Sequence, residues 1–126
     1  MRPNTLFLSA GILALIFGLG FLVAPATVLP LYGAPTDAST VLMSRFFGVA
    51  LVQLGLALYL LREVREPAAV RGLAVAGVVG SVCGALVALM GVLNGVTNAL
   101  GWSTVGIYVL LFLGYASCLR ARPAMA

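Results

Sequence analysis

The chain has no histidine and no lysine, and only 8% of its 126 residues are charged. Without histidine it has no imidazole to act as a base, ligate haem or bind a metal. Its three carboxylates, Asp37, Glu63 and Glu66, lie outside the long apolar stretches, which leaves none for a proton relay. It also has no CxxC pair and no phosphate-binding loop. We therefore expect a protein that is not an enzyme and needs no cofactor or metal.

The positive charge is also small. The net charge of +4 comes entirely from arginine, which is too little to suggest a nucleic-acid partner. The two cysteines, Cys83 and Cys118, lie at different depths of their apolar stretches. We interpret both as small apolar packing residues rather than as a disulfide.

Long apolar stretches fill most of the chain. Four of them cover Thr5–Ala24, Thr40–Leu61, Gly72–Leu93 and Trp102–Leu119, and a membrane span needs ~20 apolar residues. The sequence predicts an all-α fold: an integral membrane four-helix bundle forming one domain over residues 1–126. We expect no cleaved signal peptide, because the first apolar run is longer than the ~7–15 residues of a signal sequence.

The arginines predict how the bundle is oriented. The connection 25–39 has no arginine and the connection 94–101 has no charge. Positive charge near span ends marks the cytoplasmic side. We therefore expect both termini and the 62–71 connection in the cytoplasm. Six of the seven arginines fall on that side: Arg2, Arg62, Arg65, Arg71, Arg120 and Arg122.

The connection 25–39 is apolar and contains Pro25, Pro30 and Pro35. We expect it to lie in the outer interface without forming a helix, because proline interrupts helical hydrogen bonding. Asp37, Ser39 or Thr40 should cap the helix that follows.

Arg45 is the one charge inside a predicted span, about five residues from its outer end. Its side chain can reach the outer headgroups, so it is interpreted first as an anchor or as a partner of Asp37. The alternative is a site for a lipid phosphate, an anionic ligand or a partner carboxylate. Asn94 and Asn98, with nearby Thr97 and Ser103, are the residues that could converge there.

Gln53 lies near the middle of the second span. An amide in an apolar medium seeks a partner on another helix, which favours a packing role; a ligand contact in a bundle cavity is the alternative.

The third span carries small residues, among them Gly77, Gly80, Gly84 and Gly91, close to one helix face. That face predicts close packing within the bundle or against another subunit. Tyr108 and Tyr115 share a face of the fourth span, for packing or for stacking on a flat ligand such as a quinone.

Two short segments carry a family resemblance. Arg45-Phe46-Phe47-Gly48 opens the second span, and Asn98-Ala99-Leu100-Gly101-Trp102 precedes the fourth. In these the chain resembles small bacterial inner-membrane proteins and is loosely similar to DoxX-like four-helix proteins. The resemblance implies a four-helix bundle in the bacterial inner membrane and implies no activity.

The leading hypothesis is a non-enzymatic accessory or assembly subunit that packs against a larger membrane complex. Its partners would be the lipid bilayer and other membrane subunits or further copies of itself. The alternative is a small carrier or binder of a lipophilic or anionic ligand, using the outer polar cluster around Arg45. A membrane enzyme subunit for quinone or thiol redox chemistry is the third hypothesis.

Overall fold

The computed structural model describes residues 2–120, which form five helices and no strand. The helices are α1 (Pro3–Val23), α2 (Pro25–Leu31), α3 (Ala38–Leu60), α4 (Pro67–Leu93) and α5 (Gly101–Arg120). All except α2 are long and apolar enough to cross a membrane. This confirms the predicted all-α class and the four long apolar helices. Arg122, one of the six arginines used to predict orientation, lies outside the described residues.

The short helix α2 corrects the prediction that this connection is not helical. Pro25 is the first residue of α2, where its missing N–H costs no hydrogen bond. Pro30 lies one residue before the end of α2, so it removes only one bond of the last turn. Proline at these two positions is compatible with a helix of about two turns.

The helix starts follow from local capping. Asp37, one of the three caps that the sequence allowed, is the N-cap of α3 and accepts hydrogen bonds from the backbone N–H and the hydroxyl of Thr40. Glu66 caps α4 by accepting from the N–H groups of Ala68 and Ala69, and Pro67 takes the first helical position. These caps end the first two of the three chain reversals, before α3 and before α4.

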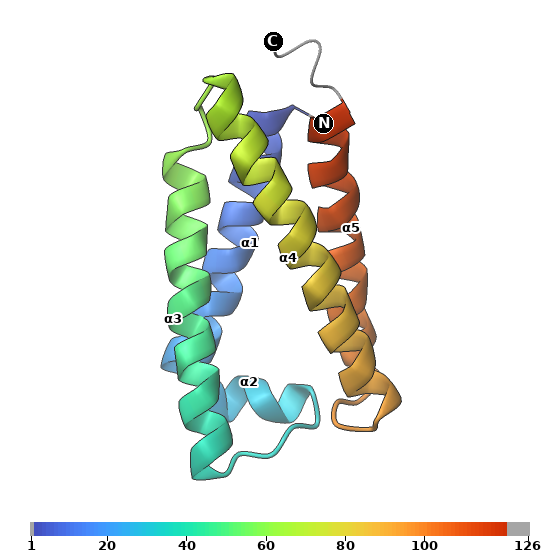
Figure 1. The fold of residues 1–126 in the computed structure, drawn as a ribbon. Helices are drawn as coiled ribbons and strands as arrows, with labels where there is room; N and C mark the ends of the chain where they lie inside the picture. The colour runs from blue at the N-terminus through green and yellow to red at the C-terminus, as the bar shows by residue number, and fades with distance from the viewer. Residues whose placement is uncertain (1, 121–126) are drawn as a thin grey trace.

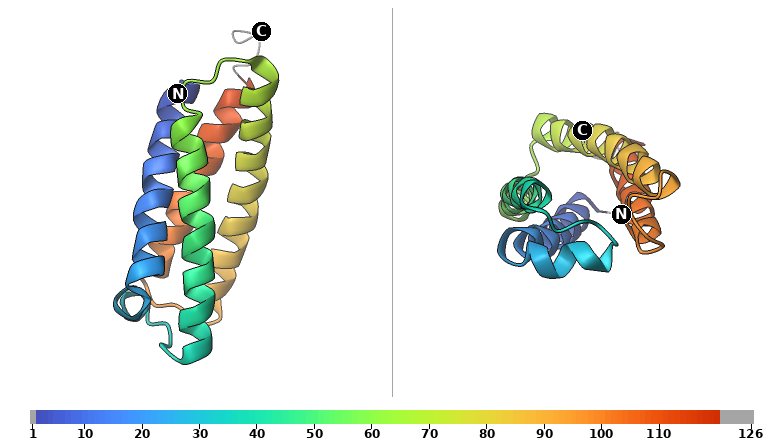
Figure 2. Two further views of the ribbon diagram at one scale, coloured as in Figure 1. Left: turned by 90° about the vertical axis from the view of Figure 1, so that its left-hand side faces the viewer. Right: turned by 90° about the horizontal axis from the view of Figure 1, so that it is seen from below.

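The long helices pack as two antiparallel pairs, α1 with α3 and α4 with α5 (Figure 1). The pairs approach each other at the end where α1 begins, α5 ends and α3 turns into α4 (Figure 1). We call this the arginine-rich end, because Arg2, Arg62, Arg65 and Arg120 lie there. The opposite end, which we call the α2 end, has α2 lying across it, as the view from below shows (Figure 2).

Glycines hold α1 against α3. Gly11 on α1 faces Gly55 on α3, and Gly18 on α1 faces Gly48 on α3. On each helix the two glycines are seven residues apart, which is about two helical turns. A Cβ atom on Gly55 would lie 2.8 Å from the Gly11 carbonyl oxygen, and one on Gly48 would lie 2.7 Å from that of Gly18. The two backbones therefore touch, which only residues without a side chain allow.

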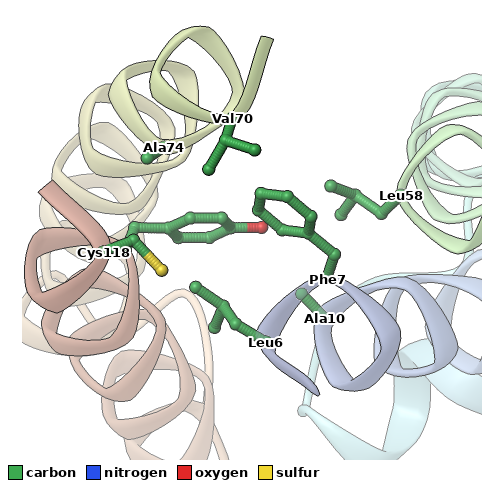
Figure 3. Packing of buried hydrophobic residues seen from close by; sticks show 8 residues of the cluster. Leu6, Phe7, Ala10, Leu58, Val70, Ala74 and Cys118 are labelled. Atoms are coloured by element: carbon green, nitrogen blue, oxygen red, sulfur yellow. The ribbon is translucent and has the colours of Figure 1, made fainter. Parts of the chain in front are cut away.

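A cluster of buried side chains joins the two pairs near the arginine-rich end (Figure 3). Phe7 lies at its centre and is fully buried, with its ring 6.4 Å from that of Tyr115 between centroids. All four long helices contribute to this cluster. Its members are Leu6, Phe7, Ala10, Leu58, Val70, Ala74, Tyr115 and Cys118.

Candidate functional site: the outer face of α4 and the polar residues

The predicted small-residue face of α4 divides into two parts. Gly77 receives the ring of Tyr115, and Gly84 receives the ring of Tyr108. Both glycines and both tyrosines are spaced by seven residues, so the antiparallel helices match ring to gap twice. A Cβ on either glycine would overlap the ring it faces. The two tyrosines are thus engaged in packing α5 against α4.

Gly80 and Gly91 are placed differently. A Cβ on Gly91 would meet only Thr97, at 3.8 Å, in the connection that follows α4. A Cβ on Gly80 would have no atom of the chain within 4 Å. The part of the chain that the structure describes therefore leaves Gly80 facing outward.

Gly80 belongs to a line of exposed small residues, which we call the α4 stripe: Gly72, Ala76, Gly80 and Cys83. Their spacings of four, four and three place them on one face of the helix. Gly72 resembles Gly80 in having open space where its Cβ would be. The sequence analysis missed this line because it joined Gly80 to the glycines facing α5. The spacing from Gly72 through Ala76 to Gly80 was the available signal.

Arg45 is exposed on α3. The partner first suggested for it, Asp37, directs its carboxylate to Thr40 instead, with 2.6 Å between the Thr40 hydroxyl and an Asp37 oxygen. That hydroxyl lowers the pKa of Asp37, and the backbone N–H of Thr40 adds to the effect. Within residues 2–120, Arg45 makes no side-chain hydrogen bond, so its guanidinium is available to a group outside the chain.

The other predicted polar residues are scattered. Gln53 is exposed on α3, and no hydrogen bond within the described part of the chain joins it to another helix. Asn94 is the exposed C-cap residue of α4, where its backbone N–H donates to the Met90 carbonyl. No hydrogen bond among residues 2–120 joins Arg45 or Gln53 to either asparagine.

Asn98 has a clear structural place at the α2 end. Its side-chain amide donates to the Leu31 carbonyl at 3.0 Å, and its backbone N–H donates to the Tyr32 carbonyl at 2.8 Å. Its side-chain oxygen accepts from the N–H of Leu100. Asn98 thereby ties α2 to the connection between α4 and α5, and so links the two helix pairs at the end opposite the buried cluster.

Comparison with known proteins adds no assignment: the chain matches no family model, and no similar curated protein or solved structure was found. The resemblance to DoxX-like proteins stays a prediction.

Proposed function

We propose that the chain is a multi-pass membrane protein that acts without catalysis, as an accessory subunit whose α4 stripe packs against a helix of a larger membrane complex. Its surface supports the membrane setting. Each long helix turns a large apolar side chain outward, more than three-fifths exposed: Ile16, Leu60, Val87 and Leu110. Water would penalise such a surface on every side, whereas lipid tails match it.

The single observation that carries the accessory role is the α4 stripe. In a bilayer, helices associate chiefly through close van der Waals packing, and small residues permit it. The chain uses this device internally, at Gly11 with Gly55 and at Gly18 with Gly48. Gly72 and Gly80 offer the same surface with nothing of the described chain against it. A helix from another subunit is the occupant that this surface fits.

The proposal also includes the orientation of the bundle in the membrane. Among the charged side chains of the described residues, five arginines lie at or near the arginine-rich end, whereas the α2 end has only Asp37 and, further into α3, Arg45. This asymmetry supports a cytoplasmic location of the arginine-rich end, with both termini inside, in a bacterial inner membrane. The carrier hypothesis stays a prediction, because no observation brings Arg45, Gln53, Asn94 and Asn98 together.

Cys83 provides the test because it lies on the α4 stripe and is exposed, whereas Cys118 is buried. A photoreactive maleimide is attached to Cys83 in a Cys118→Ala background and illuminated in native membranes. The matched control carries the label on another exposed position of α4, about 100° around the helix from Cys83, as Val82→Cys with Cys83→Ala. We expect a discrete adduct with another protein from position 83 and none from position 82.

Two results would refute the proposal. Equal or absent adducts from both positions would mean that the α4 stripe faces lipid. An adduct of twice the chain's own mass would assign the stripe to a second copy rather than to a larger complex.

A further inference from the structure

A pocket of about 330 Å³ opens at the arginine-rich end, between the start of α1 and the connection from α3 to α4. Its size falls at the lower end of the ~300–1,000 Å³ typical of small-molecule sites. The polar groups that line it come from both segments: Arg2, Asn4, Arg62, Glu63 and Arg65.

The base of the pocket is apolar. Val70, which lines it, is 2% exposed and belongs to the buried cluster around Phe7. Val64, the other valine of the lining, is half-buried and packs against the same cluster. The pocket thus has three arginines in its lining and hydrocarbon at its base, which suits a ligand with an anionic group next to an apolar part.

Arg62 is held in a defined orientation. Its Nη1 atom donates to the Tyr59 carbonyl oxygen at 2.7 Å, and its guanidinium carbon lies 4.2 Å from the centroid of the Tyr59 ring. The hydrogen bond uses one of the five N–H donors of the guanidinium. The others remain for an oxyanion, and a positioned fork loses less side-chain entropy on binding one.

The pocket is positively charged, because the acidic residues near it among the described residues do not balance its arginines. Glu66, the N-cap residue of α4, accepts hydrogen bonds with both carboxylate oxygens from the N–H groups of Ala68 and Ala69. Glu63 is the one acidic residue in the lining, whereas three arginines line it: Arg2, Arg62 and Arg65. Three positive charges and one negative charge give the lining a formal charge of +2. Arginine guanidinium groups bind a phosphate or a carboxylate through paired hydrogen bonds, and phosphate is the group that every phospholipid headgroup supplies.

We propose that this pocket binds the phosphate of an anionic phospholipid headgroup. This rests on the membrane setting of the proposed function and is independent of the accessory role. The helices that frame the pocket are apolar to within a few residues of this end, which sets the pocket at headgroup depth in a bilayer. The pocket holds a headgroup and leaves the acyl chains to the lipid around the helices.

The test uses full-length protein in neutral detergent and native mass spectrometry with added phosphatidylglycerol or phosphatidylcholine of equal chain length. We expect tighter binding of the anionic lipid and a loss of about tenfold, or ~1.4 kcal/mol, in Arg62→Gln. Arg2→Gln should weaken binding in the same direction, and it tests the pocket independently because the Arg2 side chain makes no capping bond. Arg71→Gln, which is exposed and outside the lining, is the control.

Glu63→Gln supplies a result that damage to the fold would not produce, because removal of the one carboxylate should tighten phosphatidylglycerol binding. Inorganic phosphate distinguishes the source of the ligand. Failure of millimolar phosphate to displace the lipid supports the headgroup, whereas displacement supports the same site with free phosphate as its ligand. Equal binding of both lipids, or equal weakening by Arg71→Gln, would overturn the proposal and leave only diffuse surface charge.

Discussion

Replacing Gly48 with alanine should destabilise the protein, although alanine is the better helix former. At Gly48 the new methyl group would lie 2.6 Å from the Leu22 backbone nitrogen and 2.7 Å from the Gly18 carbonyl oxygen. Both are backbone atoms of α1, which cannot rotate away as a side chain can. Relief of the clash needs a separation of α1 from α3 by several tenths of an ångström.

The size of the effect follows from two opposing terms. The helix preference of alanine over glycine is worth ~1 kcal/mol, and overpacking costs ~1–3 kcal/mol. The shift also opens the contacts at Gly11 and Gly55 on the same interface, where a gap of ~0.5–1 Å forfeits a quarter to a half of each contact's attraction. We therefore expect a net loss of about 1–2 kcal/mol for Gly48→Ala.

Gly80→Ala is the matched control, because its methyl group meets nothing within 4 Å and only the helix preference acts. It should leave stability unchanged or raise it by up to ~1 kcal/mol. The assay is unfolding by increasing sodium dodecyl sulfate in mixed micelles, followed by helical circular dichroism and by the fluorescence of Trp102. A Gly48→Ala variant as stable as Gly80→Ala would refute the backbone contact between α1 and α3.

Three further outcomes are expected. Asn98→Ala should lose about 1–2 kcal/mol and increase hydrogen exchange in α2, because it removes two side-chain hydrogen bonds, whereas the exposed Asn94→Ala should change little. The pKa of Asp37 is lowered in the fold, so the stability that its carboxylate contributes is full above the unfolded pKa of 3.8 and is lost as the pH falls through the folded pKa. Asp37→Asn keeps a hydrogen-bond acceptor but does not titrate, so between about pH 5 and about pH 3 it should lose less stability than the wild type. In a cysteine-free background, a membrane-impermeant thiol reagent added to intact cells should label Val96→Cys and spare Glu63→Cys, and the reverse labelling would contradict the proposed orientation.

The sequence predicts the long helices well because hydropathy and span length are strong signals. Asp37 was one of three predicted caps and is the N-cap observed. The failure at α2 came from treating every proline as a helix breaker, although Pro25 begins the helix and Pro30 lies close to its end. Position in the helix decides what a proline costs, and the composition of a segment does not reveal it.

The pairing of the helices was not predicted, for a physical reason. Each long helix is apolar on all sides, so no polar face indicates which side turns inward. The usable signal was the seven-residue spacing of small residues, at Gly11 and Gly18 and again at Gly48 and Gly55. The density of small residues in α4 drew the prediction there instead. The pocket around Arg62 joins segments nearly sixty residues apart, and only the packing of α1 beside α3 brings them together.

The most direct measurement of the accessory role is co-purification of wild type, Gly80→Leu and Gly84→Leu in mild detergent, with stability measured on the same samples. A Cβ atom at position 80 has no atom of the described chain within 4 Å, whereas one at position 84 meets the Tyr108 ring. We predict that Gly80→Leu keeps wild-type stability and loses the co-purifying partner, while Gly84→Leu loses stability itself. A Gly80→Leu protein that retains every partner of the wild type would contradict the proposal that the α4 stripe holds this chain in a larger complex.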